Sequence, residues 1–279
     1  MLKRTITAIV ALAVFIPVLY FSHTIVFPAA MAALAIIAAG EMLGCIGAKE
    51  IKYIIPSFLL AVCPLVPYIS AKTGKIDTYA AVCAMICVYL VYLLALSVFQ
   101  KGKIPFEKIG TVFTSICYVV ITFTAVSALR QGEGGKYLYL LTFLGPWVSD
   151  TFAYFCGRLF GRHKLIPEVS PKKTVEGSVG GIVFTAVGFV VYGFIISKIT
   201  DGAVSPSYLP LAATGMIVSA ISQIGDLAAS LIKRNYGIKD YGSLFPGHGG
   251  VLDRFDSVLL TAPVLLIVSS LPFFGNILM

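Results

Sequence analysis

Residues 77–99 read DTYAAVCAMICVYLVYLLALSVF, and this stretch decides the class of fold. Only its first residue, Asp77, is charged, and the run is long enough to cross the hydrocarbon core of a bilayer as a helix, which takes about 20 mostly apolar residues. We therefore predict an all-α polytopic membrane protein with about nine transmembrane helices. The nine apolar runs are 5–22, 24–43, 53–71, 77–99, 108–129, 137–160, 178–198, 207–232 and 255–277.

The composition of the whole chain supports this class. Of its 279 residues 58% are hydrophobic and only 12% are charged, whereas soluble domains carry about 25% charged residues. This excludes a disordered protein, a disulfide-rich secreted domain and a nucleic-acid binder with a basic stripe. The six cysteines are expected to be small apolar fillers. We assign the net charge of +8 to cytoplasmic loops and to attraction by anionic lipid headgroups.

Basic residues also predict the orientation in the membrane. Lys3 and Arg4 precede an apolar run without a small-residue cleavage site, so this segment is expected to be a retained helix with a cytoplasmic N-terminus. Alternating sides from there places 16 of the 21 basic residues in the cytoplasm and the C-terminus outside. The five that stay outside are Lys72, Lys75, Arg130, Lys136 and Lys198.

The two longest cytoplasmic loops are expected to carry the function. They span residues 161–177 and 233–254 and hold most of the unusual polar residues. We accordingly divide the chain into an N-terminal region, 1–130, with five transmembrane helices, and a catalytic region, 131–279, with the last four and both loops.

The densest polar stretch, residues 230–256, reads SLIKRNYGIKDYGSLFPGHGGVLDRFD. Pro246, Gly247, Gly249 and Gly250 surround His248, so that backbone N–H groups can approach a ligand closely. Asp253 and Asp256 are three residues apart at a predicted helix start, which places both carboxylates on one face. Such a pair suits a divalent cation bound together with phosphates, or it complements the positive end of a helix dipole.

Two further acids lie inside apolar runs, Asp226 in the eighth and Asp150 in the sixth. Intramembrane acids usually face a cavity, an ion or a partner, although a neighbouring polar group can also satisfy them. Asp150 shares a helix face with Tyr154 and Gly157, and it lies one turn after Trp147. Packing at the headgroup level would explain the two aromatic residues, Trp147 and Tyr154.

Residues 170–177 read SPKKTVEG. Ser170 is expected to be an N-cap with Pro171 as first helical residue, which would leave free N–H groups beside Lys172 and Lys173 as a site for phosphate. The alternative is an ordinary positively charged cytoplasmic loop. Gly177, Gly180 and Gly181 are expected to permit close contact between helices.

These motifs resemble the phosphatidate cytidylyltransferases, also called CDP-diacylglycerol synthases. The 147–177 block is similar to a second region of that family, and the first 130 residues match only in character. The residues that match the signature in order and spacing are Ser230, Ile232, Lys233, Arg234, Lys239, Asp240, Gly242, Phe245, Pro246, His248, Gly249, Gly250, Val251, Asp253, Arg254, Phe255 and Asp256.

The resemblance implies condensation of CTP with phosphatidic acid, giving CDP-diacylglycerol and pyrophosphate, with Mg²⁺ and possibly a second cation as cofactor. It also implies a homodimer in the bacterial cytoplasmic membrane, with the active site facing the cytoplasm and no nucleic-acid partner. The implied metal ligands are Asp226 and Asp253, with Asp256 in the same cluster. The CTP phosphates would meet Lys172, Lys173 and Thr174.

The implied catalytic residues are Asp226, Lys233, Arg234, His248, Asp253 and Asp256, with the role of His248 left open. The implied substrate-binding residues are Asp150, Arg158, Ser170, Lys172, Lys173, Thr174, Glu176, Lys239, Asp240, Gly249, Gly250 and Arg254. One alternative function is a CTP-dependent polyprenol or phytol kinase, which would transfer the γ-phosphate. Another is an ion-coupled transporter that uses Asp150 and Asp226.

Overall fold

The structure is a computed structural model that describes residues 2–274 and 277–278, with only the backbone described for residues 2–6 and 8. The side chains of Lys3 and Arg4 and the C-terminal Met279, on which the predicted orientation partly depends, therefore lie outside the described part. The elements in chain order are α1 (Leu2–Tyr20), α2 (Val26–Cys45), α3 (Ile51–Leu60), the short 3₁₀ helix η1 (Cys63–Leu65), α4 (Val66–Thr73), α5 (Thr78–Phe99), α6 (Phe106–Gln131), α7 (Gly135–Leu138), α8 (Leu141–Phe160), β1 (Lys164–Ile166), β2 (Ser170–Thr174), α9 (Val175–Ile199), α10 (Tyr208–Asn235), α11 (Leu252–Phe255) and α12 (Val258–Ser270).

The helical class predicted from the sequence is confirmed, and six helical stretches are long and apolar enough to cross a membrane. These are α2, the stretch Ile51–Thr73, α5, α6, α9 and α10. Two shorter apolar helices, Ile9–Tyr20 within α1 and α12, fall in the first and last predicted runs. The chain is thus an integral membrane protein, while the count of nine spans and the side of each terminus stay predictions.

The third predicted run is not one continuous helix. It is divided into α3, η1 and α4, and α3 ends at Leu60. A proline lacks the N–H for the helical hydrogen bond, and its ring clashes with the carbonyl four residues earlier. Pro64 stands four residues after Leu60, so it cannot donate the hydrogen bond to the Leu60 carbonyl that would continue α3.

The chain forms two compact units, both discontinuous in sequence. The first comprises Met1–Gln131 and Tyr236–Phe255, and the second comprises Gly132–Asn235 and Asp256–Met279. The core of the first unit lies between α2 and α6, where Ala35, Ala38 and Ala39 are fully buried. Such small residues let helix backbones approach closely. The predicted division after residue 130 by function stays a prediction.

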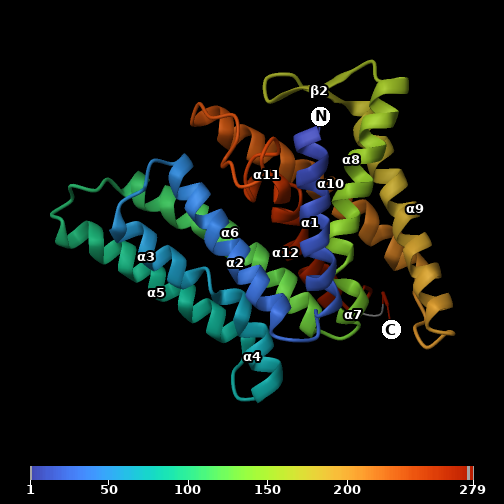
Figure 1. The fold of residues 1–279 in the computed structure, drawn as a ribbon, viewed down its shortest axis with the longest axis horizontal. Helices are drawn as coiled ribbons and strands as arrows, with labels where there is room; N and C mark the ends of the chain where they lie inside the picture. The colour runs from blue at the N-terminus through green and yellow to red at the C-terminus, as the bar shows by residue number, and fades with distance from the viewer. Residues whose placement is uncertain (1, 275–276, 279) are drawn as a thin grey trace. The chain divides into compact units, whose positions relative to one another are not determined.

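The second unit is built on α8, α9 and α10, which pack against one another. In Figure 1 α8 and α9 run side by side, and the chain passes from one to the other through the segment labelled β2. Phe152 of α8 and Phe184 of α9 stack with ring centroids 4.2 Å apart. Ser149 of α8 and Ser219 of α10 share a buried hydrogen bond of 2.8 Å. This packing positions the N-terminal end of α9, next to which the candidate site lies.

Candidate active site

The 161–177 loop folds as a small antiparallel hairpin rather than as the start of a helix. Lys164 pairs with Thr174, and Ile166 pairs with Ser170. The prediction that Ser170 caps a helix and that Pro171 is its first residue is therefore wrong. Residues 170–174 are engaged by β1, and the Lys164 ammonium donates a hydrogen bond of 2.8 Å to the Pro171 carbonyl.

Thr174 is the residue that caps α9. Its backbone is extended, and its hydroxyl oxygen accepts a hydrogen bond from the Gly177 N–H at 3.2 Å. Threonine is a favoured N-cap because its short side chain can reach an N–H of the first turn that has no helical partner. Sequence reasoning placed the cap four residues too early because serine followed by proline carries the same local signal.

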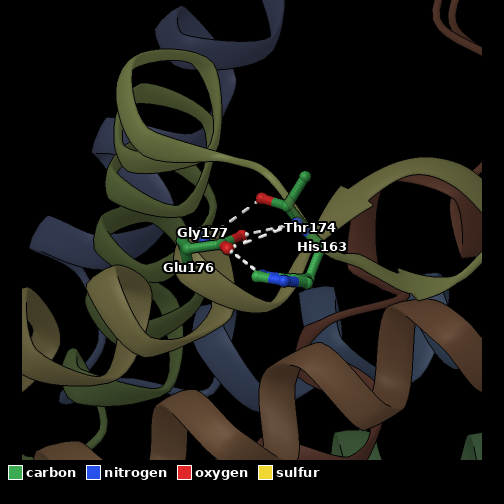
Figure 2. Close-up of polar contacts among 4 residues, drawn as sticks. All are labelled: His163, Thr174, Glu176 and Gly177. Carbon is green, nitrogen blue, oxygen red and sulfur yellow. Dashed lines mark hydrogen bonds and ion pairs between the residues drawn. The ribbon is translucent and has the colours of Figure 1, made fainter.

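Glu176, in the first turn of α9, joins the hairpin to the helix (Figure 2). Its carboxylate accepts hydrogen bonds from the His163 N–H at 3.2 and 3.3 Å and lies 2.7 Å from His163 Nδ1. The Val175 N–H donates to the His163 carbonyl at 3.0 Å. The two ends of the hairpin are therefore held together at the start of α9, and Lys172 and Lys173 lie on the strand between them.

Glycines allow α8, the hairpin and α9 to approach closely, as predicted for Gly177, Gly180 and Gly181. A Cβ added to Gly177 would lie 2.6 Å from the Ala153 carbonyl oxygen, and one on Gly181 would lie 3.1 Å from that of Ser149. A Cβ on Gly157 of α8 would lie 2.8 Å from the Thr174 hydroxyl oxygen. The cap of α9 is therefore packed directly against α8.

The structure brings together Lys173 of β2 and Asp226 of α10. The Lys173 ammonium and the Asp226 carboxylate form an ion pair of 2.5 Å, with the two side chains 26% and 27% exposed. The intramembrane acid thus has a cationic partner from the hairpin. This contact links two motifs that are more than 50 residues apart in the sequence.

Asp256 adds a second carboxylate to this cluster in the second unit. It lies between α11 and α12 and interacts electrostatically with Asp226, Lys233 and Asp150. Its Oδ1 accepts a hydrogen bond of 2.8 Å from the Ser257 N–H. Acids and lysines from four parts of the sequence are thereby gathered into one charged cluster.

Asp253 has a different environment in the first unit. It is buried, and its Oδ2 accepts hydrogen bonds from the Tyr241 N–H at 2.8 Å and the Gly250 N–H at 2.9 Å. The prediction that Asp253 and Asp256 share one helix face is wrong, because α11 ends at Phe255 and Asp256 follows it. Asp253 instead holds the glycine-rich loop, which we define as residues 236–251.

Sequence reasoning missed Glu41, whose carboxylate also binds this loop. Its Oε1 accepts from the Val251 N–H and its Oε2 from the Leu252 N–H, both at 2.9 Å. A Cβ on Gly242 or on Gly250 would collide with the same carboxylate. The available signal was its position: Glu41 is the only charged residue of the second apolar run.

The chain matches the description of the cytidylyltransferase family over residues 2–271. It belongs to the cytidylyltransferase family. Among similar proteins, the phosphatidate cytidylyltransferase of Staphylococcus saprophyticus is 38% identical over 94% of this chain and 96% of that protein. Those of Staphylococcus haemolyticus and Staphylococcus aureus are 35% and 33% identical, again over 94% of this chain and 96% of each relative. The predicted resemblance, and with it the prediction of a nucleotidyltransferase enzyme, is confirmed.

The predicted site residues of this cytidylyltransferase are distributed over both units. The second unit holds Asp150, Arg158, Ser170, Lys172, Lys173, Thr174, Glu176, Asp226, Lys233, Arg234 and Asp256. The first holds Lys239, Asp240, His248, Gly249, Gly250, Asp253 and Arg254. Their roles toward substrate stay predictions. His248 is half-buried, and its Nδ1 has no hydrogen-bond partner in the part of the chain that the structure describes.

The charges of this cytidylyltransferase fall into two kinds. Asp226, Asp256 and Lys173 are at least partly shielded, whereas other cations of the predicted site are exposed to solvent. The exposed ones are Arg158, Lys172, Arg234, Lys239 and Arg254. Arg158 is held along α8 by the Tyr154 hydroxyl, which accepts a hydrogen bond of 3.1 Å from its Nη1. The exposed cations are free to meet a polyanion that arrives from water.

Proposed function

We propose that this protein is a phosphatidate cytidylyltransferase, which condenses CTP with phosphatidic acid to CDP-diacylglycerol and pyrophosphate for phospholipid synthesis. The observation that carries the proposal is the match to relatives of that name along almost the whole chain at 33–38% identity. The cluster of acids and lysines in the second unit also supports it, because a reaction between two polyanions needs cations for the phosphates and acids for a metal ion.

The cations would bind the substrate phosphates. Lys172 is exposed on β2 and is suited to the CTP phosphates, together with Lys173 and the Thr174 hydroxyl. Lys173 now pairs with Asp226, so phosphate binding by this lysine would exchange one anionic partner for another. Lys233 and Arg234 at the end of α10 are suited to the phosphate of the lipid.

Mg²⁺ is the cofactor that the family implies, and the donor chemistry fits it. No group of three or more His, Cys, Asp and Glu side chains within residues 2–274 and 277–278 is arranged to hold a metal ion. Magnesium, however, is usually bound by one or two carboxylates together with substrate phosphates and water. Asp226 and Asp256 offer such a pair, and Asp253 would be the third ligand that the resemblance implies. A bound magnesium ion would neutralise charge on the CTP phosphates and on pyrophosphate.

The reaction would proceed by in-line attack of a phosphatidate oxygen on the α-phosphorus of CTP. The bond to the β-phosphate oxygen breaks and pyrophosphate leaves. The attacking phosphomonoester is already mostly ionised near neutral pH, so a strong general base is not required. The protein therefore contributes chiefly by holding the two phosphates together, and His248 would donate a hydrogen bond to one of them.

The experiment compares two labels in CTP. Purified protein is incubated with phosphatidic acid, Mg²⁺ and CTP labelled either at the α- or at the γ-phosphate. We expect the α-label to enter the lipid fraction and the γ-label to leave as pyrophosphate. Label from the γ-phosphate in the lipid would instead show a CTP-dependent lipid kinase, and solute counterflow without a lipid product would show a transporter.

The same proposal includes the setting of the enzyme. CTP is made in the cytoplasm and does not cross a bilayer, so the site is proposed to face the cytoplasm of a bacterial cell. The excess of basic residues in the loops that we assign to that side supports this orientation. A homodimer is proposed on the family resemblance alone.

A further inference from the structure

Glu41 is an acid near the C-terminal end of the apolar helix α2, and it contacts the glycine-rich loop across 210 residues of sequence. Its two carboxylate oxygens are used separately. Oε1 binds the Val251 N–H and Oε2 binds the Leu252 N–H, each at 2.9 Å. A carboxylate that binds two successive amides fixes both the position and the direction of that backbone.

The loop is also shaped around this carboxylate. Gly242 and Gly250 lie at two separate points of the loop, and a side chain at either would collide with Glu41. Neither glycine has a left-handed backbone, because both are absent from the positive-φ residues that the structure describes. The need for glycine at these two positions therefore comes from the space that Glu41 occupies.

The same segment is also held by Asp253. Gly250 donates its N–H to Asp253, and the next two amides go to Glu41. Two carboxylates from distant parts of the chain thus take consecutive N–H groups. We infer that Glu41 is a positioning residue, which fixes the glycine-rich loop so that Asp253 is held in its working place. This inference rests on the proposed function, in which Asp253 belongs to the active site.

Glutamine is the substitution that tests the inference most sharply. It keeps the volume of the side chain, but it offers one acceptor oxygen, and its NH₂ group would face the second amide as a donor. One charge-assisted hydrogen bond is lost and the other becomes neutral, and bonds to charged acceptors are the stronger kind. Opening of the backbone at Val251 and Leu252 should become easier, while the core of α2 and α6 keeps its packing.

The first measurement is amide hydrogen exchange of the full-length protein in detergent. In Glu41→Gln we expect exchange about tenfold faster or more in peptides that cover residues 241–252, with no change in peptides from α6. Glu50→Gln is the matched control, because Glu50 is 62% exposed and pairs with Lys52 rather than with the loop. Unchanged exchange at 241–252, or an equal rise everywhere, would overturn the inference.

The second measurement separates positioning from general destabilisation. We expect Glu41→Gln to lower kcat by about tenfold in protein whose α6 peptides exchange as in the wild type. If Glu41 acts through Asp253, adding Glu41→Gln to Asp253→Asn should cost less than about a further twofold. A further tenfold loss would show independent roles and contradict the inference. Failure of the wild-type protein to form CDP-diacylglycerol would sink the proposed function, whereas the exchange result tests the loop by itself.

Discussion

The Lys173–Asp226 ion pair joins two residues for which the sequence predicts different ligands, a nucleotide phosphate for the lysine and a metal ion for the aspartate. Asp226 is therefore not an isolated acid inside a membrane helix, which would be energetically expensive. A substitution of either residue also changes the surroundings of the other. A test of either role must therefore separate the loss of the residue's own contacts from the effect on its partner.

Asp226→Asn is the first such variant. It keeps the shape but removes the charge that the proposed metal binding needs, so we expect turnover to fall by about a hundredfold or more. The protein should still insert and purify, and its thermal midpoint in detergent provides the check. Asp201→Asn, at an exposed turn, is the control and should leave turnover unchanged. Turnover near that of the wild type in Asp226→Asn would remove this residue from the metal site.

Lys172 and Lys173 can be distinguished by the kcat of their alanine variants. Lys172 is exposed, so Lys172→Ala should raise the KM for CTP without disturbing Asp226. Lys173→Ala should raise the same KM and in addition lower kcat, because Asp226 loses its ion-pair partner. Steady-state kinetics with each substrate varied in turn gives the test. A raised KM for phosphatidate, with that for CTP unchanged, would assign the pair to the lipid headgroup.

At this scale the sequence indicated Asp226, Asp253 and the lysines, because acids in apolar runs and paired cations stand out locally. It did not indicate which residues meet. Glu41 is as conspicuous as Asp226 by the same criterion, yet its partners are backbone N–H groups, which carry no residue-specific signal. Contacts of that kind become visible only when the loop has a definite conformation.

The hairpin is joined to the start of α9, so its position depends on the packing of α9 against α8. Gly177→Ala would place a Cβ 2.6 Å from the Ala153 carbonyl oxygen, which is a backbone atom and cannot move without shifting the helix. Overpacking of this kind costs about 1–3 kcal/mol. We therefore expect a lower thermal midpoint for this variant, together with a raised KM for CTP if the hairpin binds the nucleotide.

Gly188→Ala is the matched control on the same helix. Its Cβ would lie 3.4 Å from the nearest Val148 methyl group, an ordinary contact. Alanine is favoured over glycine in a helix by about 1 kcal/mol, so this variant should be as stable as the wild type or more so. Equal midpoints for the two variants would show that α8 and α9 are not packed as described.

Hydropathy predicted the long helices well and the short elements poorly. The run at 77–99 became α5, which spans Thr78–Phe99, because a lipid-exposed helix needs nothing beyond apolar length. The hydropathy of residues 53–71 predicted one continuous run, although Pro64 within it is a residue that disfavours a continuous helix. The hairpin was missed because three or five residues per strand give too short a pattern, and its pairing depends on the His163 and Glu176 contacts.

The whole molecule must present both functional loops to the compartment that contains CTP. Loops 161–177 and 233–254 should therefore face the cytoplasm, and the 199–206 turn should face outward. Single cysteines at Lys164, Asp240 and Asp201, in a background without the six native cysteines, test this in intact cells. We expect a membrane-impermeant thiol reagent to label only the cysteine at position 201.

The control for cysteine reactivity uses the same three variants after the cells are opened, when all three cysteines should be labelled. Equal labelling of position 164 or 240 in intact cells would disprove the nine-helix arrangement. An active site that is supplied from the cytoplasm through these loops would then be untenable as well.

The 210-residue separation between Glu41 and Val251 also means that the two residues are synthesised at different times. A ribosome adds about 5–20 residues per second, so α2 waits on the order of ten to forty seconds before the amides that bind its acid have been made. Throughout that interval the nascent first unit lacks its final segment, Tyr236–Phe255. A chain that stops short of this segment keeps an uncompensated carboxylate in an apolar helix. Completion of the first unit therefore depends on the synthesis of Val251 and Leu252, whose amides bind this carboxylate.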